Sequence, residues 1–298
     1  MENLLNQPIR NAISIDVEDY FQVAALSETI NVSEWENISS RVECNTHKIL
    51  DLFDQYNVKA THFILGWIAD RFPNLVKEIA NRGHEVASHG YSHQLIYNQS
   101  KEVFRQETDK SKKILEDIIG EEVIGYRAAS YSITKKSLWA LDILAEAGFK
   151  YDSSIFPVYH DNYGIHGSPV EPHILQTPKG HKMVEYPLSI YKAFGQTIPI
   201  AGGGYFRLYP YWLSRYFYRQ MNKKLKSFVF YLHPWEVDPD QPKVDVSWFS
   251  KFRHYNNLDK CEGRLSKLLS EFNFTTMKDK LDHLGMFKEG QEIEARYV

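Results

Sequence analysis

The sequence has little of several features that would point to particular protein classes. It contains only two cysteines, Cys44 and Cys261, far apart in a chain of 298 residues. It therefore predicts neither a disulfide-stabilised scaffold nor a cysteine-rich zinc site. Lys and Arg together number 35 and Asp and Glu together number 38, and this near balance lacks the basic excess of a dedicated nucleic-acid-binding protein. We expect no nucleic-acid partner.

Long apolar runs are also missing. No stretch is long and apolar enough to predict a membrane-spanning helix. The first residues, Met-Glu-Asn-Leu-Leu-Asn-Gln-Pro, lack the basic and apolar regions of a signal peptide. We therefore expect a cytoplasmic location. Aromatic residues are plentiful at 14%, with 19 Tyr and 6 Trp, which suits a large core and also a groove that stacks against sugar rings.

Short β-rich runs alternate with amphipathic helical runs along the chain. We expect strands at 11–16, 58–65, 84–88, 123–127, 150–152, 183–190 and 227–232, and helices at 40–55, 72–82, 101–119, 134–147, 210–222 and 257–272. We also expect a long loop at 153–182 and a tight turn at the three glycines 202–204. This alternation predicts a mainly parallel sheet. Its length favours an α/β fold of the distorted (β/α) barrel type with about seven βα units, related to the TIM barrel.

The glycine-rich phosphate-binding fingerprint is absent after the first strand, which argues against a dinucleotide-binding sheet. We expect a single domain over residues 1–298, with 237–298 as a C-terminal extension packed on the barrel. The sequence does not define an oligomeric state.

Charged and titratable residues stand at the ends of five expected strands. In β/α barrels the carboxyl ends of the strands build the active site, so these residues should share one rim. They are Asp16, Glu18, Asp19, His89, His93, Arg127, Asp152 and His233.

His89 and His93 are spaced i, i+4, which on a helical turn would put both imidazoles on one face, close enough to bind one metal ion. Two imidazoles and one carboxylate leave coordination positions open, as a catalytic metal requires. One carboxylate of the acidic cluster at 16–19 would bind the metal, and another would act as a base. The alternatives are surface histidines and an ordinary acidic loop.

His233 follows the most hydrophobic strand and is a candidate general acid in a partly desolvated wall. The alternative is a core histidine with a satisfied hydrogen bond. Arg127 and Asp152 would either form a structural ion pair or tune the base and the acid of the site.

Taken in order, these residues resemble the NodB-homology polysaccharide deacetylases, also called carbohydrate esterase family 4. The acidic motif of the family is matched by Asp16 with Glu18 or Asp19, and its paired-histidine motif by His89 and His93, with Gly90 in place of the usual Ser or Thr. The arginine motif is matched by Arg127, although Ala129 and Ser130 stand where proline and an aromatic residue are usual.

Two further motifs of the family are matched more loosely. They are represented by Asp152 in Tyr-Asp-Ser-Ser and by His233 directly after Leu232. The run Ala-Gly-Gly-Gly-Tyr-Phe-Arg from Ala201 and the run His-Pro-Trp-Glu from His233 are similar to the branch found in exopolysaccharide gene clusters, which carries an extra C-terminal region.

The resemblance implies metal-dependent removal of N-acetyl groups from the amino sugars of a polysaccharide or its precursor. Asp16 would be the base, Arg127 would keep it ionised, and His233 would protonate the departing amine while Asp152 holds its tautomer. The cofactor would be one divalent ion, zinc or else cobalt or nickel, held by His89, His93 and either Glu18 or Asp19. A backbone N–H near Ser130 would meet the oxyanion. Exposed aromatic side chains would line the sugar groove, namely Tyr131, Tyr205, Phe206 and Trp235.

The expected partner is an acetylated oligo- or polysaccharide, with peripheral contact to a lipid-linked glycan as a further possibility. Two other readings remain open. On the same fold, some relatives hydrolyse another non-peptide C–N bond, in a small cyclic amide. A non-catalytic carbohydrate-binding relative would have lost one of the catalytic groups, yet every candidate is present in this sequence.

Overall fold

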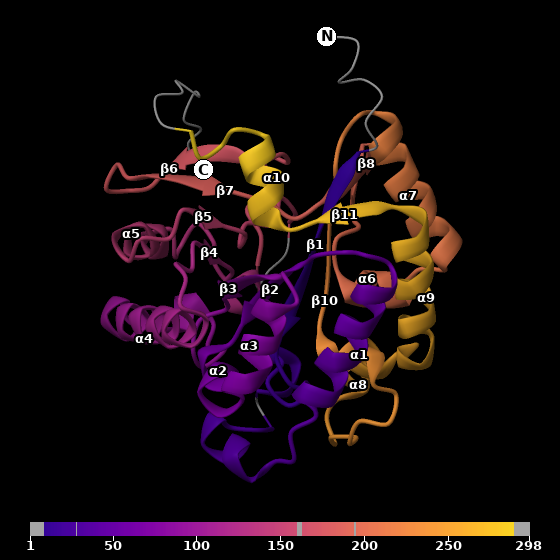
Figure 1. Cartoon of the computed structure of the whole chain (residues 1–298), viewed down its shortest axis with the longest axis horizontal. Helices are drawn as coiled ribbons and strands as arrows, with labels where there is room; N and C mark the ends of the chain where they lie inside the picture. Colours follow the sequence, from indigo (N-terminus) through magenta and orange to yellow (C-terminus); the bar gives the residue numbers. More distant parts are fainter. Residues whose placement is uncertain (1–8, 28, 160–162, 194, 289–298) are drawn as a thin grey trace.

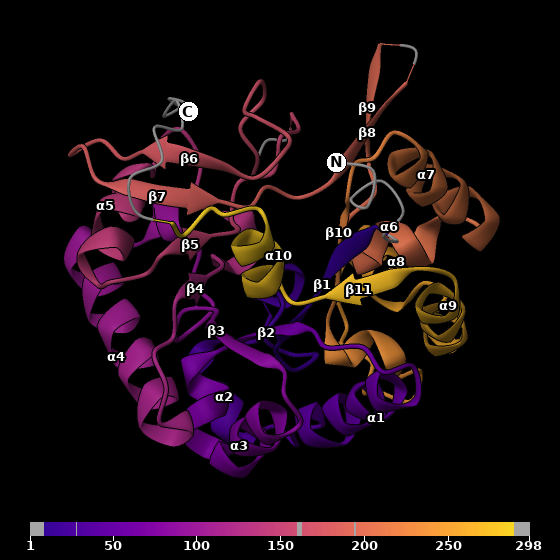
Figure 2. The same ribbon diagram turned by 45° about the horizontal axis from the view of Figure 1, so that its top comes forward.

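A computed structural model describes residues 9–27, 29–159, 163–193 and 195–288. Its main sheet is curled, with helices on the outside (Figures 1 and 2). Along the path of the sheet the strands follow the order β10-β1-β2-β3-β4-β5-β7-β6. The seven from β10 to β7 are joined by parallel pairings in this described part of the chain, and β6 is antiparallel to β7. The distorted (β/α) barrel expected from the sequence is confirmed.

The strands of this sheet are short except for the first. Their bounds are β1 (Arg10–Val17), β2 (Thr61–Ile64), β3 (Glu85–Ser88), β4 (Gly125–Tyr126), β5 (Tyr151–Asp152), β6 (His173–Gln176), β7 (Lys182–Glu185), β10 (Val229–Leu232) and β11 (Asn273–Thr275), which pairs in parallel with the first residues of β1. A separate hairpin consists of β8 (Ile190–Ala193) and β9 (Gln196–Pro199). Irregular chain closes the barrel between β7 and β10, where the amide of Tyr231 donates to the carbonyl of Ala201.

Helices surround the sheet. They are α1 (Val42–Gln55), α2 (Gly66–Arg71), α3 (Pro73–Asn81), α4 (Lys101–Ile119), α5 (Trp139–Glu146), α6 (Gly203–Leu208), α7 (Tyr211–Lys223), α8 (Trp248–Tyr255), α9 (Leu258–Glu271) and α10 (Met277–His283). In the described parts of the chain, 3-10 turns in the connections are η2 (Ala24–Leu26), η3 (Val32–Asn37), η4 (Ile96–Asn98), η5 (Ala129–Tyr131) and η6 (Pro234–Val237). Among the described residues, no helix combines the length and the apolar character needed to cross a bilayer.

The core has two layers because side chains alternate between the two faces of each strand. Ile13, Ile15 and Val17 of β1 pack outward in the larger cluster, against the helices. Ala12, by contrast, belongs to a smaller cluster inside the barrel.

Helix α10 lies over the opening of the barrel (Figure 2). Met277 and Leu281 join the inner cluster. The amide of Met277 donates to the hydroxyl of Thr61 at 2.7 Å, so the interior is filled at the amino ends of the strands. The opposite rim, at the carboxyl ends, is left for chemistry.

Several expected elements differ in the structure. The expected strand at 183–190 ends at Glu185, and the expected loop at 153–182 contains strand β6. The glycine run does not form a tight turn, because Gly203 begins helix α6. Helix α2 and strand β11 were not foreseen.

Candidate active site

The side chains that converge at the carboxyl rim continue the inward face of their strands. On β1 the inward register of Ala12 places Asp16 and Glu18 inside the barrel. Ala87 and Val229 also belong to the inner cluster. His89 follows Ala87 by two residues and His233 follows Val229 by four, and an even spacing turns both side chains inward. The alternation of side chains along the strands thus places Asp16, Glu18, His89 and His233 on the same inner face. All four residues are mainly or fully buried.

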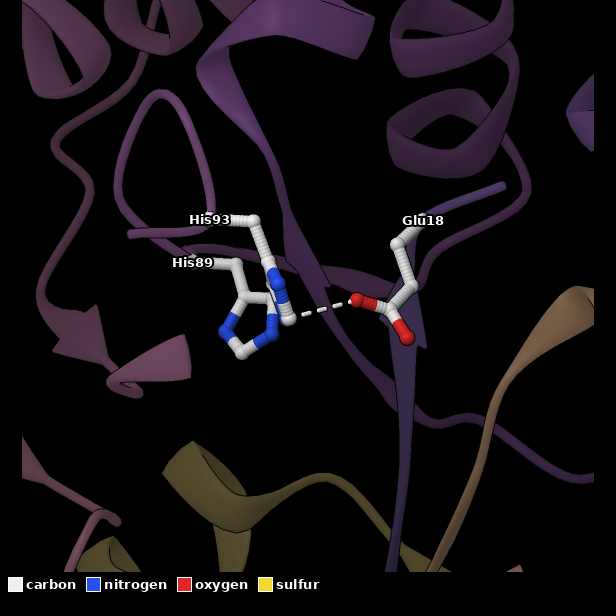
Figure 3. Close-up of side chains that lie close together, drawn as sticks. All are labelled: Glu18, His89 and His93. Atoms are coloured by element: carbon white, nitrogen blue, oxygen red, sulfur yellow. Dashed lines mark ion pairs between the residues drawn. The ribbon is translucent and has the colours of Figure 1, made fainter. Parts of the chain in front are cut away.

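Glu18, His89 and His93 form a group that could hold a metal ion. Each offers one ligand atom, and these atoms lie within 4.8 Å of one another. Figure 3 shows the two imidazoles on one side and the carboxylate of Glu18 facing them. Two nitrogen atoms and one carboxylate oxygen match the donor set of a catalytic divalent metal site with open positions.

The two histidines do not share a helical turn, so this part of the sequence interpretation was wrong. Residues 89–95 have no helical structure. Gly90 and His93 adopt positive φ values of 76° and 55°. The loop formed by these residues places the two ring centroids 5.4 Å apart. Gly90, at the usual Ser/Thr position, adopts a positive φ at low energetic cost because it has no side chain.

The orientation of His89 is fixed by the main chain. Its Nδ1 lies 2.8 Å from the carbonyl oxygen of Arg127. Because a carbonyl only accepts, Nδ1 carries the proton and Nε2 keeps its lone pair. Burial lowers the pKa of His89 to about 4, although Asp16 opposes the shift. The imidazole is therefore neutral at pH 7, as a metal ligand must be.

Glu18 is a buried carboxylate among imidazoles. Burial would raise its pKa, but the neighbouring rings of His93 and His233 outweigh that effect and hold the pKa well below its usual range. Trp235 Nε1 donates to Oε1 at 3.2 Å. Oε2 lies 2.7 Å from Nε2 of His93, yet the contact does not have hydrogen-bond angles, so Oε2 is a buried acceptor without a donor.

Asp16 is paired with a fully buried guanidinium. Arg127 Nη1 donates to Oδ1 of Asp16 at 2.6 Å, and Tyr131 donates its hydroxyl to Oδ2 at 3.3 Å. Ser14 and Ser153 hold the same guanidinium in place. The carboxylate of Asp16 is thus held in one orientation, with Oδ2 4.0 Å from Nε2 of His233.

His233 is oriented by a residue that the sequence analysis missed. Its Nδ1 lies 2.8 Å from Oε1 of Glu236, and its Nε2 lies 3.4 Å from Oε1 of Glu18. Glu236 is fully buried, and its Oε2 accepts a hydrogen bond from Nε of Arg207 at 2.6 Å. Burial would raise the pKa of Glu236, but Arg207 and His233 lower it to about 2. The signal was in the two sequence runs already singled out, since one contains Arg207 and the other Glu236.

The glycine run makes room for this carboxylate. A Cβ atom at Gly203 would lie 2.1 Å from Oε1 of Glu236, whereas a Cβ at Gly204 would meet nothing within 4 Å. Glycine is therefore needed at position 203 because the carboxylate of Glu236 lies against its Cα, and not because the chain turns there.

Asp152 does not orient His233, and this expectation is corrected. Tyr151 faces the inner cluster, so Asp152 points to the other face of β5. Its carboxylate accepts from the hydroxyl and the amide of Ser154 at 2.6 and 3.0 Å, and it is level with Glu185 on β7. Burial raises the pKa of Asp152 to about 6.

Asp19 also lies outside the site. Its Oδ2 accepts from the hydroxyl of Ser40 at 2.6 Å and from the amides of Arg41 and Val42 at 2.8 and 3.1 Å. Asp19 thus caps the start of α1. Of the two candidate carboxylates, Glu18 is the one that lies with the histidines.

The aromatic side chains expected to line an open groove are mostly buried. Tyr131, Phe206 and Trp235 are 7%, 1% and 6% exposed, so they are not groove walls open to solvent. Tyr205 is half-buried on α6, and Ser130 is half-buried at the rim with a φ of 50°.

Two family models match consecutive parts of the chain. Residues 34–151 match the model described as "Polysaccharide deacetylase" and residues 153–282 match the model described as "Domain of unknown function (DUF3473)". Among curated relatives, a peptidoglycan-N-acetylglucosamine deacetylase of Bacillus cereus is 45% identical over 75 residues, covering 25% of this chain and 27% of that protein. A peptidoglycan deacetylase of Helicobacter pylori is 34% identical over 116 residues, covering 38% of each. The chain thus spans well under half the length of these relatives.

Solved structures share the whole fold at low identity. A candidate polysaccharide deacetylase from Mycobacterium smegmatis superposes with a TM-score of 0.61 at 18% identity, over 98% of both chains. An allantoinase superposes with a TM-score of 0.60 at 16% identity, over 94% of this chain and 91% of that one. At such identities these likenesses establish the fold alone.

Proposed function

This chain matches the polysaccharide deacetylase family (NodB homology, carbohydrate esterase family 4) over residues 34–151 and the DUF3473 family over residues 153–282, and on that premise we propose that it hydrolyses the N-acetyl groups of amino sugars in a glycan. The observation that carries the proposal is the convergence of three kinds of group at one rim. The possible metal ligands Glu18, His89 and His93 form the first group. The carboxylate of Asp16, paired with Arg127, and the imidazole of His233 lie within a few ångströms of them.

The residues of the triad fit a divalent cation. Glu18 Oε2 is a buried acceptor without a donor, and His89 keeps the lone pair of Nε2 because its other ring nitrogen is bonded to a carbonyl. The chemistry that a divalent cation supplies in such a site is Lewis acidity, which polarises an acetamide carbonyl and acidifies water. We propose zinc as the ion, with cobalt or nickel as alternatives.

Asp16 is the proposed base. Its Oδ1 is occupied by Arg127, which leaves Oδ2 as the atom that takes a proton from the attacking water. The buried guanidinium pairs with the carboxylate and fixes its plane. Tyr131 donates its hydroxyl to the same Oδ2, and the second lone pair of that oxygen is available for the proton.

His233 is the proposed acid. Glu236 accepts the proton on Nδ1, so Nε2 is the ring nitrogen that faces Asp16 and Glu18. Burial alone would lower the pKa of His233, but Glu18 and Glu236 raise it to about 9. We propose that Nε2 passes a proton to the departing amine, which is otherwise a poor leaving group. A backbone N–H near Ser130 remains the proposed oxyanion donor.

The remaining features of the proposal concern the setting of the reaction. We propose a cytoplasmic enzyme of exopolysaccharide biosynthesis that acts on an oligo- or polysaccharide or its precursor, with peripheral contact to a lipid-linked glycan. We also propose that residues 1–298 act as one domain, with 237–298 as its extension. The pairing of β11 with β1 supports that unity, because it carries the extension into the main sheet.

Metal content and acetate release test this proposal together. The purified chain should hold about one divalent ion, and His89→Ala should remove it. The loaded chain should release acetate from N-acetylglucosamine oligomers. Hydrolysis of a cyclic amide such as allantoin without acetate release would favour the other C–N hydrolase, and glycan binding without turnover would favour a non-catalytic relative.

A further inference from the structure

Helix α8 exposes three aromatic side chains to solvent. Trp248, Phe249 and Phe252 are 76%, 60% and 42% exposed. The rings of Trp248 and Phe252 are nearly parallel, with centroids 5.6 Å apart and an angle of 14° between their planes. We call these three residues the α8 aromatic face. Leaving such area in water is unfavourable, and grouped exposed apolar side chains commonly mark a binding surface.

Helix α8 is joined to the candidate acid through its buried side, by a stack of rings that ends at His254. His233 stacks on Trp235 with centroids 5.1 Å apart, and Trp235 stacks on His254 of α8 with centroids 4.3 Å apart. His254 is buried on α8. The helix therefore lies directly behind one wall of the site, at the end of the molecule toward which β1 and β10 run (Figure 1).

The helix is held rigidly in that position. Arg207, which pairs with Glu236, also donates to the carbonyls of Arg253, His254 and Asn256 at 3.1, 2.9 and 2.7 Å. One buried guanidinium thus ties the carboxyl end of α8 to the carboxylate that orients His233. A ligand bound on the aromatic face would have a fixed position relative to the reacting group.

The chemistry of the face suits a neutral ligand with flat apolar surfaces. Lys251 is neutralised by Asp245 at 2.6 Å, and the guanidinium of Arg253 lies over the ring of Phe249. The segment therefore lacks the concentrated basic charge that draws an amphipathic helix to an anionic membrane. Pyranose rings carry faces of C–H groups that pack on aromatic planes. At the site, three of the four aromatic side chains expected to line a groove are buried.

We propose that the α8 aromatic face binds a sugar ring of the glycan some residues away from the ring that is deacetylated. The inference rests on the proposed deacetylase function and narrows its substrate class to chains of several sugars. Binding energy from a remote part of a substrate can be used to position the reacting part. Long chains should therefore react faster than short ones, and Trp248 should carry much of that difference.

Trp248→Ala tests this, with Trp212→Ala as the matched control. Trp212 is 68% exposed but belongs to α7, which lies away from α8 in Figure 1. The probes are N-acetylglucosamine oligomers of two and six sugars. We expect the ratio of kcat/KM for the hexamer to that for the dimer to fall about tenfold in Trp248→Ala and to keep the wild-type value in Trp212→Ala. Melting temperatures of both variants should match the wild type.

A binding titration separates this inference from the proposed function. Calorimetry with the hexamer on chelator-treated protein needs no turnover, and Trp248→Ala should weaken the affinity about tenfold. If wild-type protein releases no acetate from either oligomer, the proposed function is overturned while the titration still reports on α8. The inference would be overturned if both tryptophan variants lost hexamer affinity equally, or if kcat/KM did not depend on chain length. It would also be overturned if Trp248→Ala kept hexamer affinity and lost only vesicle binding or self-association.

Discussion

The imidazole of His233 is bonded through Nδ1 to Glu236 at 2.8 Å, so its other nitrogen faces Asp16 and Glu18 across the site. The partner is three residues further along the same chain. Because Glu236 is itself held by Arg207 at 2.6 Å, the orientation of His233 depends on helix α6 as well as on its own strand. This relationship allows the roles of the acid and of its supporting residues to be tested separately.

Replacing His233 by Ala should lower turnover strongly without removing the metal. A general acid contributes about 10²- to 10⁴-fold to rate, so acetate release should fall within that range. His233 is not one of the three residues grouped as possible ligands, and metal content should therefore stay at the wild-type value. A variant with wild-type turnover would exclude His233 as the acid.

Glu236→Gln and Asp152→Asn form a matched pair of carboxyl-to-amide changes at two fully buried positions. Glu236→Gln removes the charge that holds the proton on Nδ1, and supporting residues of this kind typically affect activity about 10- to 100-fold. Asp152 is bonded to Ser154 on the other face of its strand, so its variant should keep turnover close to wild type. Steady-state acetate release measures both. The reverse order of effects would restore Asp152 as the residue that orients His233.

Gly203→Ala should be harmful and Gly204→Ala should not. The first places a methyl group 2.1 Å from Oε1 of Glu236, while the second meets nothing within 4 Å. Overpacking of a buried site costs about 1–3 kcal/mol, so chemical denaturation should show that loss of stability for Gly203→Ala. Its turnover should fall as well, because the displaced carboxylate orients His233. Equal stability of the two variants would argue that α6 shifts to accommodate the methyl group.

The free energy of unfolding should decrease as the pH falls below 6.5 because of two buried histidines. His62 and His84 lie 4.9 Å apart, and burial lowers the pKa of His84 from 6.5 to about 4, with Lys59 adding to the effect. The unfolded chain takes up the proton first. The contribution of His84 to the free energy of unfolding is therefore fully present above pH 6.5. It is lost as the pH falls toward 4, and the loss amounts to about 3 kcal/mol.

Urea denaturation at pH 7 and pH 5 measures this loss, with His84→Gln as the test variant. The variant should be less stable at both values, since it gives up ring packing against Phe53. It should nevertheless lose less stability than the wild type between them. If the variant and the wild type lose the same free energy of unfolding between pH 7 and pH 5, other groups cause the pH dependence.

Long helices and the general fold were predictable because their signals are local. Helix α4 matches the expected bounds 101–119, since Ser100 caps its first turn and Gly120 ends it with a φ of 72°. Helix α9 differs from the expected 257–272 by one residue at each end. Strand β6 pairs with the neighbouring β7, and it escaped notice because Pro172, Pro178 and Gly180 interrupt the pattern around it. Strand β11 escaped notice because its partner, β1, lies at the other end of the sequence.

The sequence by itself determined which residue types stand at the strand ends, because strand, helix and glycine signals are written in consecutive residues. On that basis the acidic cluster, both histidines of the pair, Arg127 and His233 were all identified. Only the tertiary structure decided which of these side chains meet. A shift of one residue turns a side chain to the opposite face of a strand, so Glu18 joins the histidines while Asp19 caps α1. The contact between Arg207 and Glu236 needed the packing of α6 against η6, which no local pattern specifies.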